Sequence, residues 1–158
     1  MRRKEFEIGD RQAIVEVLRK AEIGYLAYIA PDGWPRITPL NFTFDGRILW
    51  HGAVAGERFD CLVKNPRATF SAVSCQAYLP SHFVSEENAT ASSVAFKSVI
   101  VRGRCHGVFA LIPEEMTGKF KLAQNKTEAD RRKIAAQLKE RGQPADLIAA
   151  EEILKTLP

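Results

Sequence analysis

The chain has 158 residues, of which 46% are apolar and 27% are charged, with a formal net charge of +4 and an isoelectric point near 9.1. This length and composition are typical of one globular domain with its own core, and they exclude a chain that is disordered throughout. The positive charge favours an anionic partner, either a phosphate-bearing cofactor or a nucleic acid. Because the basic residues are scattered, charge alone does not choose between the two.

The N-terminal residues and the cysteines bear on localisation and on metal binding. The first seven residues are charged and no apolar segment follows them, so we expect neither a signal peptide nor a membrane span, and we expect a cytoplasmic protein. Cys61, Cys75 and Cys105 are odd in number, widely spaced and not in a C-x-x-C arrangement. The sequence therefore predicts neither a disulfide framework nor a metal site.

In chain order, the first predicted element is an amphipathic helix that Asp10 caps, with an apolar stripe within residues 13–21. From there the pattern changes to short β-rich runs at 23–30, 34–44 and 47–51, separated by turn residues. Two successive hairpins are therefore predicted to open the β-structure.

A short helix is predicted after Gly56, with Phe59, Leu62 and Val63 facing inward, and it should end before Pro66. The later predicted elements are strands at 67–73, 93–106 and 116–125, a long loop at 76–92 with room for a short element, and two helices, one capped by Thr127 and one at 144–154. Many strands, few helices and no β-α-β rhythm predict a mainly β fold, a barrel with flanking helices, in one domain over 1–158 with C-terminal helices from about residue 127.

The run 50–58 passes from a strand end through small residues into a helix start. Glycines at 52 and 56 let an anion approach the main chain, the helix N-terminus offers N–H groups, and Arg58 adds a fork of donors. This pattern indicates a phosphate site. The alternative is a connecting loop with a surface arginine.

The run 36–42 contains Pro39 inside a β-rich stretch, so Pro39 should lie at a sheet edge or at an interruption of the ladder. Main-chain groups left free there would suit a flat heteroaromatic ring with polar edges. The alternative is an edge strand that Pro39 and Arg36 protect from aggregation.

Four runs stand in a particular order along the chain: PRITPLNF at 35–42, LWHGAVAGER at 49–58, KNPRATF at 64–70 and FKSVIVRG at 96–103. Their order and spacing resemble the pyridoxamine 5'-phosphate oxidase superfamily, and within it the nitroimidazole-resistance branch of FMN-binding proteins. The opening MRRK also resembles that branch, so the likeness covers roughly the first two thirds of the chain.

This resemblance implies an FMN-binding split barrel that forms a homodimer with two flavins at the subunit interface. It places one group along the isoalloxazine edge, namely Thr38, Pro39, Leu40 and Asn41. It places a second group along the ribityl and phosphate path, namely His51, Gly52, Ala53 and Val54, with Arg58 on the phosphate. Ser98 and Lys97 would approach the cofactor from a neighbouring strand.

The C-terminal third departs from that branch, whose members usually carry a helix between the strand ending near His106 and the last strand. The sequence here predicts no such helix, and the run KFKLAQNK at 119–126 resembles a second FMN-binding group of the superfamily, described as sporulation-related transcriptional regulators. This likeness implies that Lys121, Gln124 and Asn125 approach the flavin, from the partner subunit. The alternative is that Gln124 and Asn125 only end the strand before the Thr127 cap.

We therefore expect a flavin-dependent oxidoreductase in which NADH or NADPH, or another donor, reduces FMN and FMN reduces a small-molecule acceptor. No catalytic residue is identified, and His51 could instead act as a general acid or a haem ligand. The main alternative is a regulatory protein that binds flavin or haem without turnover. A nucleic-acid partner is not expected, because aromatic residues do not clearly alternate with cations on one strand.

Overall fold

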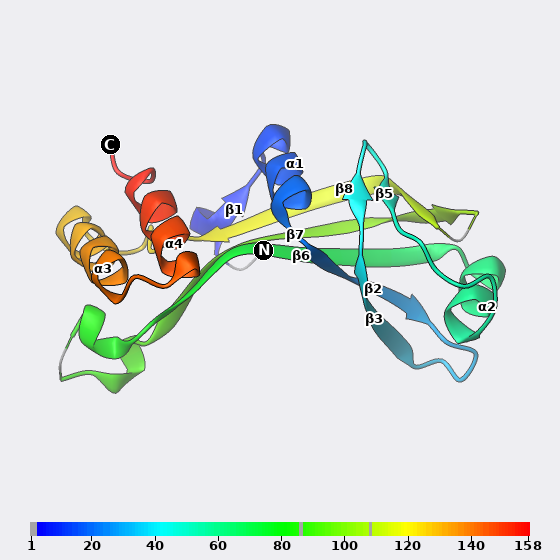
Figure 1. The fold of residues 1–158 in the computed structure, drawn as a ribbon, viewed down its shortest axis with the longest axis horizontal. Helices are drawn as coiled ribbons and strands as arrows, with labels where there is room; N and C mark the ends of the chain where they lie inside the picture. The colour runs from blue at the N-terminus through cyan, green and yellow to red at the C-terminus, as the bar shows by residue number, and fades with distance from the viewer. Residues whose placement is uncertain (1–2, 86, 108) are drawn as a thin grey trace. The chain divides into compact units, whose positions relative to one another are not determined.

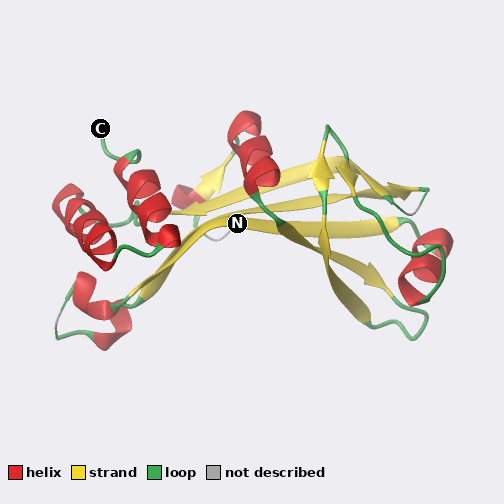
Figure 2. Cartoon of the chain, viewed as in Figure 1, coloured by secondary structure: helices red, strands yellow, loops and turns green. Residues whose placement is uncertain are grey.

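The computed structural model describes residues 3–85, 87–107 and 109–158, and these residues form antiparallel strands with flanking helices (Figures 1 and 2). The strands are β1 (Glu7–Ile8), β2 (Ile23–Ile29), β3 (Pro35–Asn41), β4 (Thr43–Phe44), β5 (Ile48–Leu49), β6 (Arg67–Leu79), β7 (Ser93–His106) and β8 (Ala110–Lys121). The helices are η1 (Lys4–Phe6), α1 (Arg11–Lys20), α2 (Glu57–Lys64), η2 (Ser81–Phe83), η3 (Ala89–Ala91), α3 (Glu128–Arg141) and α4 (Pro144–Leu154). The predicted mainly β class is confirmed. Within the described ranges, every helix is too short or too polar to cross a membrane.

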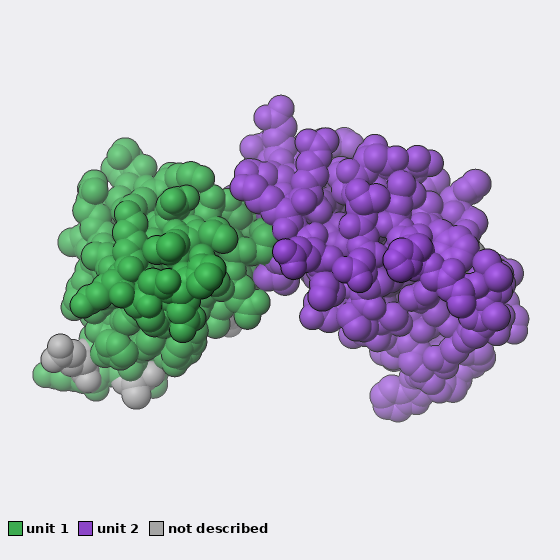
Figure 3. Space-filling model, in the orientation of Figure 1, with its two compact units in different colours: residues 1–7, 74–97, 119–158 green, residues 8–73, 98–118 purple. Residues whose placement is uncertain are grey.

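The strands pair in the order β3-β2-β6-β7-β8-β5-β4, and β1 pairs with β8. By its internal contacts the chain divides into two compact units, which Figure 3 distinguishes by colour. Unit 1 comprises 1–7, 74–97 and 119–158, and unit 2 comprises 8–73 and 98–118. The prediction of one domain over 1–158 is not tested by this division and stays a prediction.

Unit 2 contains the two predicted hairpins. In the first, β2 pairs with β3 from Ile23↔Asn41 to Ile29↔Pro35, and Gly33 takes the positive φ of 83° that the turn requires. On its other side β2 pairs with β6, where Gly24 leaves room for the Phe70 ring that a side chain would strike. The pairing of β4 with β5 forms the second hairpin. The two β2 pairings make β3 an edge strand.

Helix α1 begins as predicted, because the Gln12 N–H donates to the Asp10 carboxylate at 2.9 Å. Its buried residues are Ile14, Val17 and Leu18, which lie on the predicted stripe. Each such burial contributes about 1.5–3 kcal/mol. The stripe therefore fixes α1 on the core of unit 2.

The prediction that Val63 of helix α2 faces inward is wrong. Leu62 is buried as expected, but Val63 is 61% exposed and Cys61 takes the inward position instead. An eight-residue helix buries a narrow stripe, and positions 61 and 62 fill it. Burial raises the pKa of the Cys61 thiol, so this cysteine is a core residue.

Two strands are longer than the sequence predicted. β6 continues to Leu79, because Ala77 and Leu79 are buried in alternation with the exposed Tyr78, so the predicted loop begins later and holds η2 and η3. β8 begins at Ala110, four residues after β7 ends, and it stops at Lys121. The short connection leaves no space for the family's extra helix, as the sequence indicated.

Unit 1 packs α3 against α4 over a core of Ile134, Leu138, Ala149 and Ile153. Both helices lie where the sequence predicted them. α3 is capped by Thr127, whose hydroxyl accepts from the Asp130 N–H at 3.1 Å, and α4 starts at Pro144.

Candidate functional site

The residues of the predicted phosphate site lie in the turn between β5 and α2. Trp50 is buried and its N–H donates to the Phe109 carbonyl at 3.0 Å, whereas residues 51–57 are exposed. Gly56, the residue before α2, has a φ of 101° and gives the helix no side-chain cap. The first N–H groups of α2 therefore lack a side-chain acceptor and are directed to a ligand or to water.

Arg58 lies against Gly52 in this turn. A Cβ built at position 52 would collide with the Nη2 atom of Arg58, so only glycine lets the guanidinium lie against the main chain there. Across the described residues no carboxylate lies within ion-pair distance of Arg58. Its donors are therefore available to an anion that enters the turn.

Arg36, in the same unit, differs from Arg58 because its guanidinium already has acidic partners. Its guanidinium donates to Asp32 at 2.8 Å and lies 3.3 Å from Glu57, which precedes Arg58 in α2. The hydrogen bond from Arg36 is the first cause that lowers the pKa of Asp32. Of these two arginines, only Arg36 has an acidic partner among the described residues.

A surface cavity of about 290 Å³ lies beside the turn and is lined by residues 41–43 and 49–51. Asn41 and His51, two predicted site residues from different hairpins, meet in this lining. The Nε1 atom of Trp50 is buried without a hydrogen-bond partner among the described residues. Such an orphaned donor is costly, and a polar ligand atom or a water in the cavity would satisfy it.

The predicted isoalloxazine ledge lies on β3, the edge strand. Pro39 is exposed and stands opposite Tyr25, while Leu40 is buried opposite Gly24. Thr38 is half-buried, with its hydroxyl 3.5 Å from the Tyr28 hydroxyl. Pro39 and Asn41 therefore present the exposed side of this edge, and Leu40 belongs to the core.

The two predicted site residues of β7, Ser98 and Lys97, have different surroundings. Ser98 is half-buried in unit 2, whereas Lys97 belongs to unit 1 and forms a buried ion pair with Glu152 of α4. The Lys97 ammonium also lies 5.0 Å from the centre of the Phe120 ring. The Lys97 ammonium therefore already has an acidic partner within unit 1, and its contact with a cofactor stays a prediction.

The residues predicted from the KFKLAQNK run lie in unit 1. The Gln124 side chain accepts from the Leu122 N–H at 2.7 Å and donates to the Phe120 carbonyl at 2.8 Å. These bonds close a turn in which Ala123 has a φ of 59°. These bonds fit the end of a strand, and the expected approach of Gln124 to a flavin of the partner subunit stays a prediction. Lys121 and Asn125 line a separate cavity of the same unit.

Sequence reasoning missed two features of the site. Trp50 stands inside the quoted motif, but only its burial shows that its indole donor lacks a partner. The pairing of Glu57 with Arg36 was also missed, because it depends on the distance between a hairpin and a helix. Ala53 and Val54 are exposed in the turn, and their predicted place along the ribityl and phosphate path stays a prediction.

The sequence matches the family described as pyridoxamine 5'-phosphate oxidase over residues 10–148. No curated protein matches it. Similar solved structures include a candidate 5-nitroimidazole antibiotic resistance protein from Bacteroides thetaiotaomicron, with a TM-score of 0.59, 16% identity and coverage of 72% of this chain and 85% of that one. Flavocytochrome Anf3 from Azotobacter vinelandii has a TM-score of 0.61, 17% identity and coverage of 74% and 70%.

The FAD and heme binding protein from Mycobacterium smegmatis has a TM-score of 0.60, 14% identity and coverage of 73% of each chain. At such identities these likenesses establish the fold alone, since one fold hosts many functions. Together with the family match they confirm the split barrel that the sequence predicted.

Proposed function

The chain belongs to the pyridoxamine 5'-phosphate oxidase family, and we propose that it is a flavoprotein that binds FMN with the β5–α2 turn of unit 2. Three similar structures support a flavin ligand, since one is a flavocytochrome and two are described as binding FAD. The residues of the turn fit the terminal phosphate of FMN, and the sequence pattern of the turn indicated a phosphate site.

The observation that carries this proposal is the contact of Arg58 with Gly52. A Cβ at position 52 would collide with the guanidinium, no carboxylate among the described residues pairs with it, and α2 begins beside it without a side-chain cap. A phosphate dianion would accept from Arg58 and from the first N–H groups of α2. Asn41, His51 and Trp50 line the adjacent cavity.

Bound FMN would supply hydride and electron transfer, which no side chain of the chain itself offers. The protein would bind and orient the ring system, with the exposed β3 edge at Pro39 and Asn41 beside it. We propose an oxidoreductase that passes electrons from a reduced nicotinamide to a small-molecule acceptor. The alternative is a protein that holds flavin or haem without turnover, which the flavocytochrome likeness favours.

The first test replaces Arg58 with alanine and measures FMN affinity by flavin fluorescence. A charge-assisted bond of about 1.5–3 kcal/mol predicts a tenfold to hundredfold weaker Kd. Arg47→Ala is the matched control, because Arg47 pairs with Asp45 at 2.9 Å in the same unit, so its loss should leave the Kd unchanged. Equal affinities for all three proteins would remove Arg58 from the site.

The visible spectrum of the purified protein tests the cofactor. Flavin bands that NADH or NADPH bleaches under anaerobic conditions would support the oxidoreductase, and chromatography of the released flavin would distinguish FMN from FAD. Flavin bands that no nicotinamide bleaches would favour the binding protein. A Soret band without flavin bands would contradict the proposal.

We also propose that the protein is a twofold dimer through the outward face of β2 and β3. Ile23, Tyr25 and Ile29 alternate along this face and are about half exposed, and Ile37 on β3 is 67% exposed. A contiguous apolar face of this kind is typical of an interface with a second copy.

Light scattering checks the dimer. Ile37→Glu should shift the protein from about twice the chain mass towards the monomer, because it places a charge in the apolar face. Val63→Glu adds the same charge at an exposed position of α2 and should stay dimeric. A monomeric parent protein with flavin bound would refute the dimer.

A further inference from the structure

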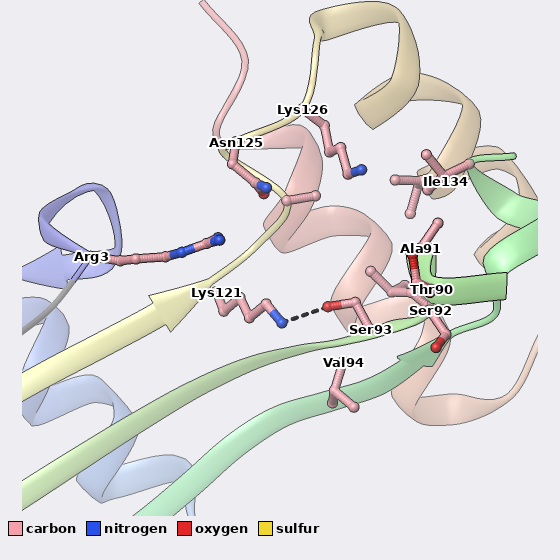
Figure 4. A pocket seen from close by; sticks show the side chains of 13 residues that line it. Arg3, Thr90, Ala91, Ser92, Ser93, Val94, Lys121, Asn125, Lys126 and Ile134 are labelled. Atoms are coloured by element: carbon pink, nitrogen blue, oxygen red, sulfur yellow. Dashed lines mark hydrogen bonds between the residues drawn. The ribbon is translucent and has the colours of Figure 1, made fainter. Parts of the chain in front are cut away.

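Unit 1 contains a second cavity, of about 180 Å³, that the proposed flavin site does not use. It lies among the ends of β6, β7 and β8, the helix η3 and the turn that precedes α3 (Figure 4). Its floor is apolar and includes Leu79, Val94 and Ile134. A ligand here would therefore meet apolar surface on one side and polar groups on the other.

The polar side of this cavity is cationic. Arg3, Lys121 and Lys126 extend towards the same space in Figure 4, together with Asn125 and the hydroxyl of Ser93. The described lining contains no carboxylate. Three positive groups that converge without an acidic residue among them create a positive potential that favours an anion.

The contacts of these cations leave their charge largely uncompensated. The Lys121 ammonium donates to the neutral Ser93 hydroxyl at 2.5 Å. Arg3 reaches Glu5 only at 4.0 Å, between two half-exposed side chains. Within the described parts of the chain, Lys126 has no ion-pair partner.

The electrostatics at Lys121 agree with this geometry. Burial is the first cause that lowers the pKa of its ammonium, and the charges of Lys119 and Arg3 lower it further. A bound anion would reverse these effects by adding an opposite charge. The attraction between Lys121 and an anion is therefore stronger in this partly buried position than it would be on the open surface.

We propose that this cavity of unit 1 binds a small phosphate monoester. A phosphate carries close to two negative charges and three acceptor oxygens, which match three separate cations better than a carboxylate does. The small organic part would lie on the apolar floor. This proposal does not rest on the flavin site, because every residue of the cavity belongs to unit 1 and Arg58 belongs to unit 2.

The test titrates the purified protein, without added FMN, with glycerol 3-phosphate and follows backbone amide shifts by NMR, with glycerol as the uncharged control. Saturable shifts at Ser93, Lys121 and Lys126 are expected with the phosphate and not with glycerol. Lys121→Met should weaken the Kd at least tenfold, since it removes one charge-assisted contact.

Lys133→Met is the matched control, because Lys133 is an exposed lysine of α3 outside the cavity, and its Kd should stay within about twofold. Lys126→Met serves as a second variant in case Lys121→Met does not fold. The proposal is overturned if no shift saturates, if Lys133→Met loses as much affinity as the cavity variants, or if added FMN displaces the phosphate from these residues. The last result would make the cavity part of the flavin site.

Discussion

Arg141 of unit 1 and Arg58 of unit 2 are both helix residues, but their guanidinium groups have opposite surroundings. Arg141 donates to both oxygens of Asp146, at 2.5 and 2.7 Å, and to the Tyr78 carbonyl at 2.8 Å. The Arg58 guanidinium lies against Gly52, and no ion pair with a carboxylate is found for it among the described residues. An arginine paired in this bidentate way with a buried carboxylate holds the fold together, whereas one without an acidic partner is available to a ligand.

The same contrast extends to other charges of the two units. In unit 1 the buried Glu152 accepts from Lys97 and from Lys155, the latter at 2.8 Å. In unit 2 the ion pairs of Arg102 and Arg104 with Glu115 and Glu114 are exposed and contribute little each. Buried ion pairs therefore hold unit 1 together, whereas these ion pairs of unit 2 lie on the surface. The predictions below test this difference between the two units.

The largest expected effect is on stability. Arg141→Met leaves the Asp146 carboxylate, which is 1% exposed, without its partner, and should lower the free energy of unfolding by about 3–5 kcal/mol. Urea denaturation measures it. Arg132→Met breaks the exposed pair with Glu128 and should cost less than about 1 kcal/mol. Equal losses in the two variants would show that burial does not distinguish these pairs.

The second prediction concerns pH. The hydrogen bond from Arg141 holds the pKa of Asp146 below its usual 3.8, so the stability it provides is complete above that pH and is lost as pH falls through the lowered pKa. In Arg141→Met, burial instead raises the Asp146 pKa, so protonation relieves the unpaired charge. The stability difference between parent and variant should therefore shrink from about pH 7 to about pH 3. A difference that is constant with pH would contradict the assignment.

The smallest expected effect is on ligand affinity. Gly52→Ala adds a Cβ that collides with Arg58 and should displace the guanidinium, weakening FMN binding about tenfold, or about 1.4 kcal/mol. Gly9→Ala is the control, since a Cβ there meets nothing within 4 Å. Fluorescence titration compares the two. Unchanged affinity in Gly52→Ala would show that the close contact does not serve the ligand.

The sequence by itself determined the local elements of this protein. Asp10 and Thr127 cap α1 and α3, the Pro31-Asp32-Gly33 turn sets the first hairpin, and Pro144 starts α4. Each signal acts within a few residues, so it can be read without the fold. The motif at 50–58 also indicated Arg58 and the glycines of the turn, because a phosphate site has a local chemistry.

Only the tertiary structure decided which charged side chains already have a partner within the protein. Lys97 meets Glu152 across 55 positions of sequence, and Arg141 meets the Tyr78 carbonyl across 63. The length of β6 also depends on tertiary structure. β6 continues to Leu79 because it pairs with β7, although the polar residues in its second half did not predict a strand. Pairing between distant residues depends on packing of the whole chain, and no local pattern records it.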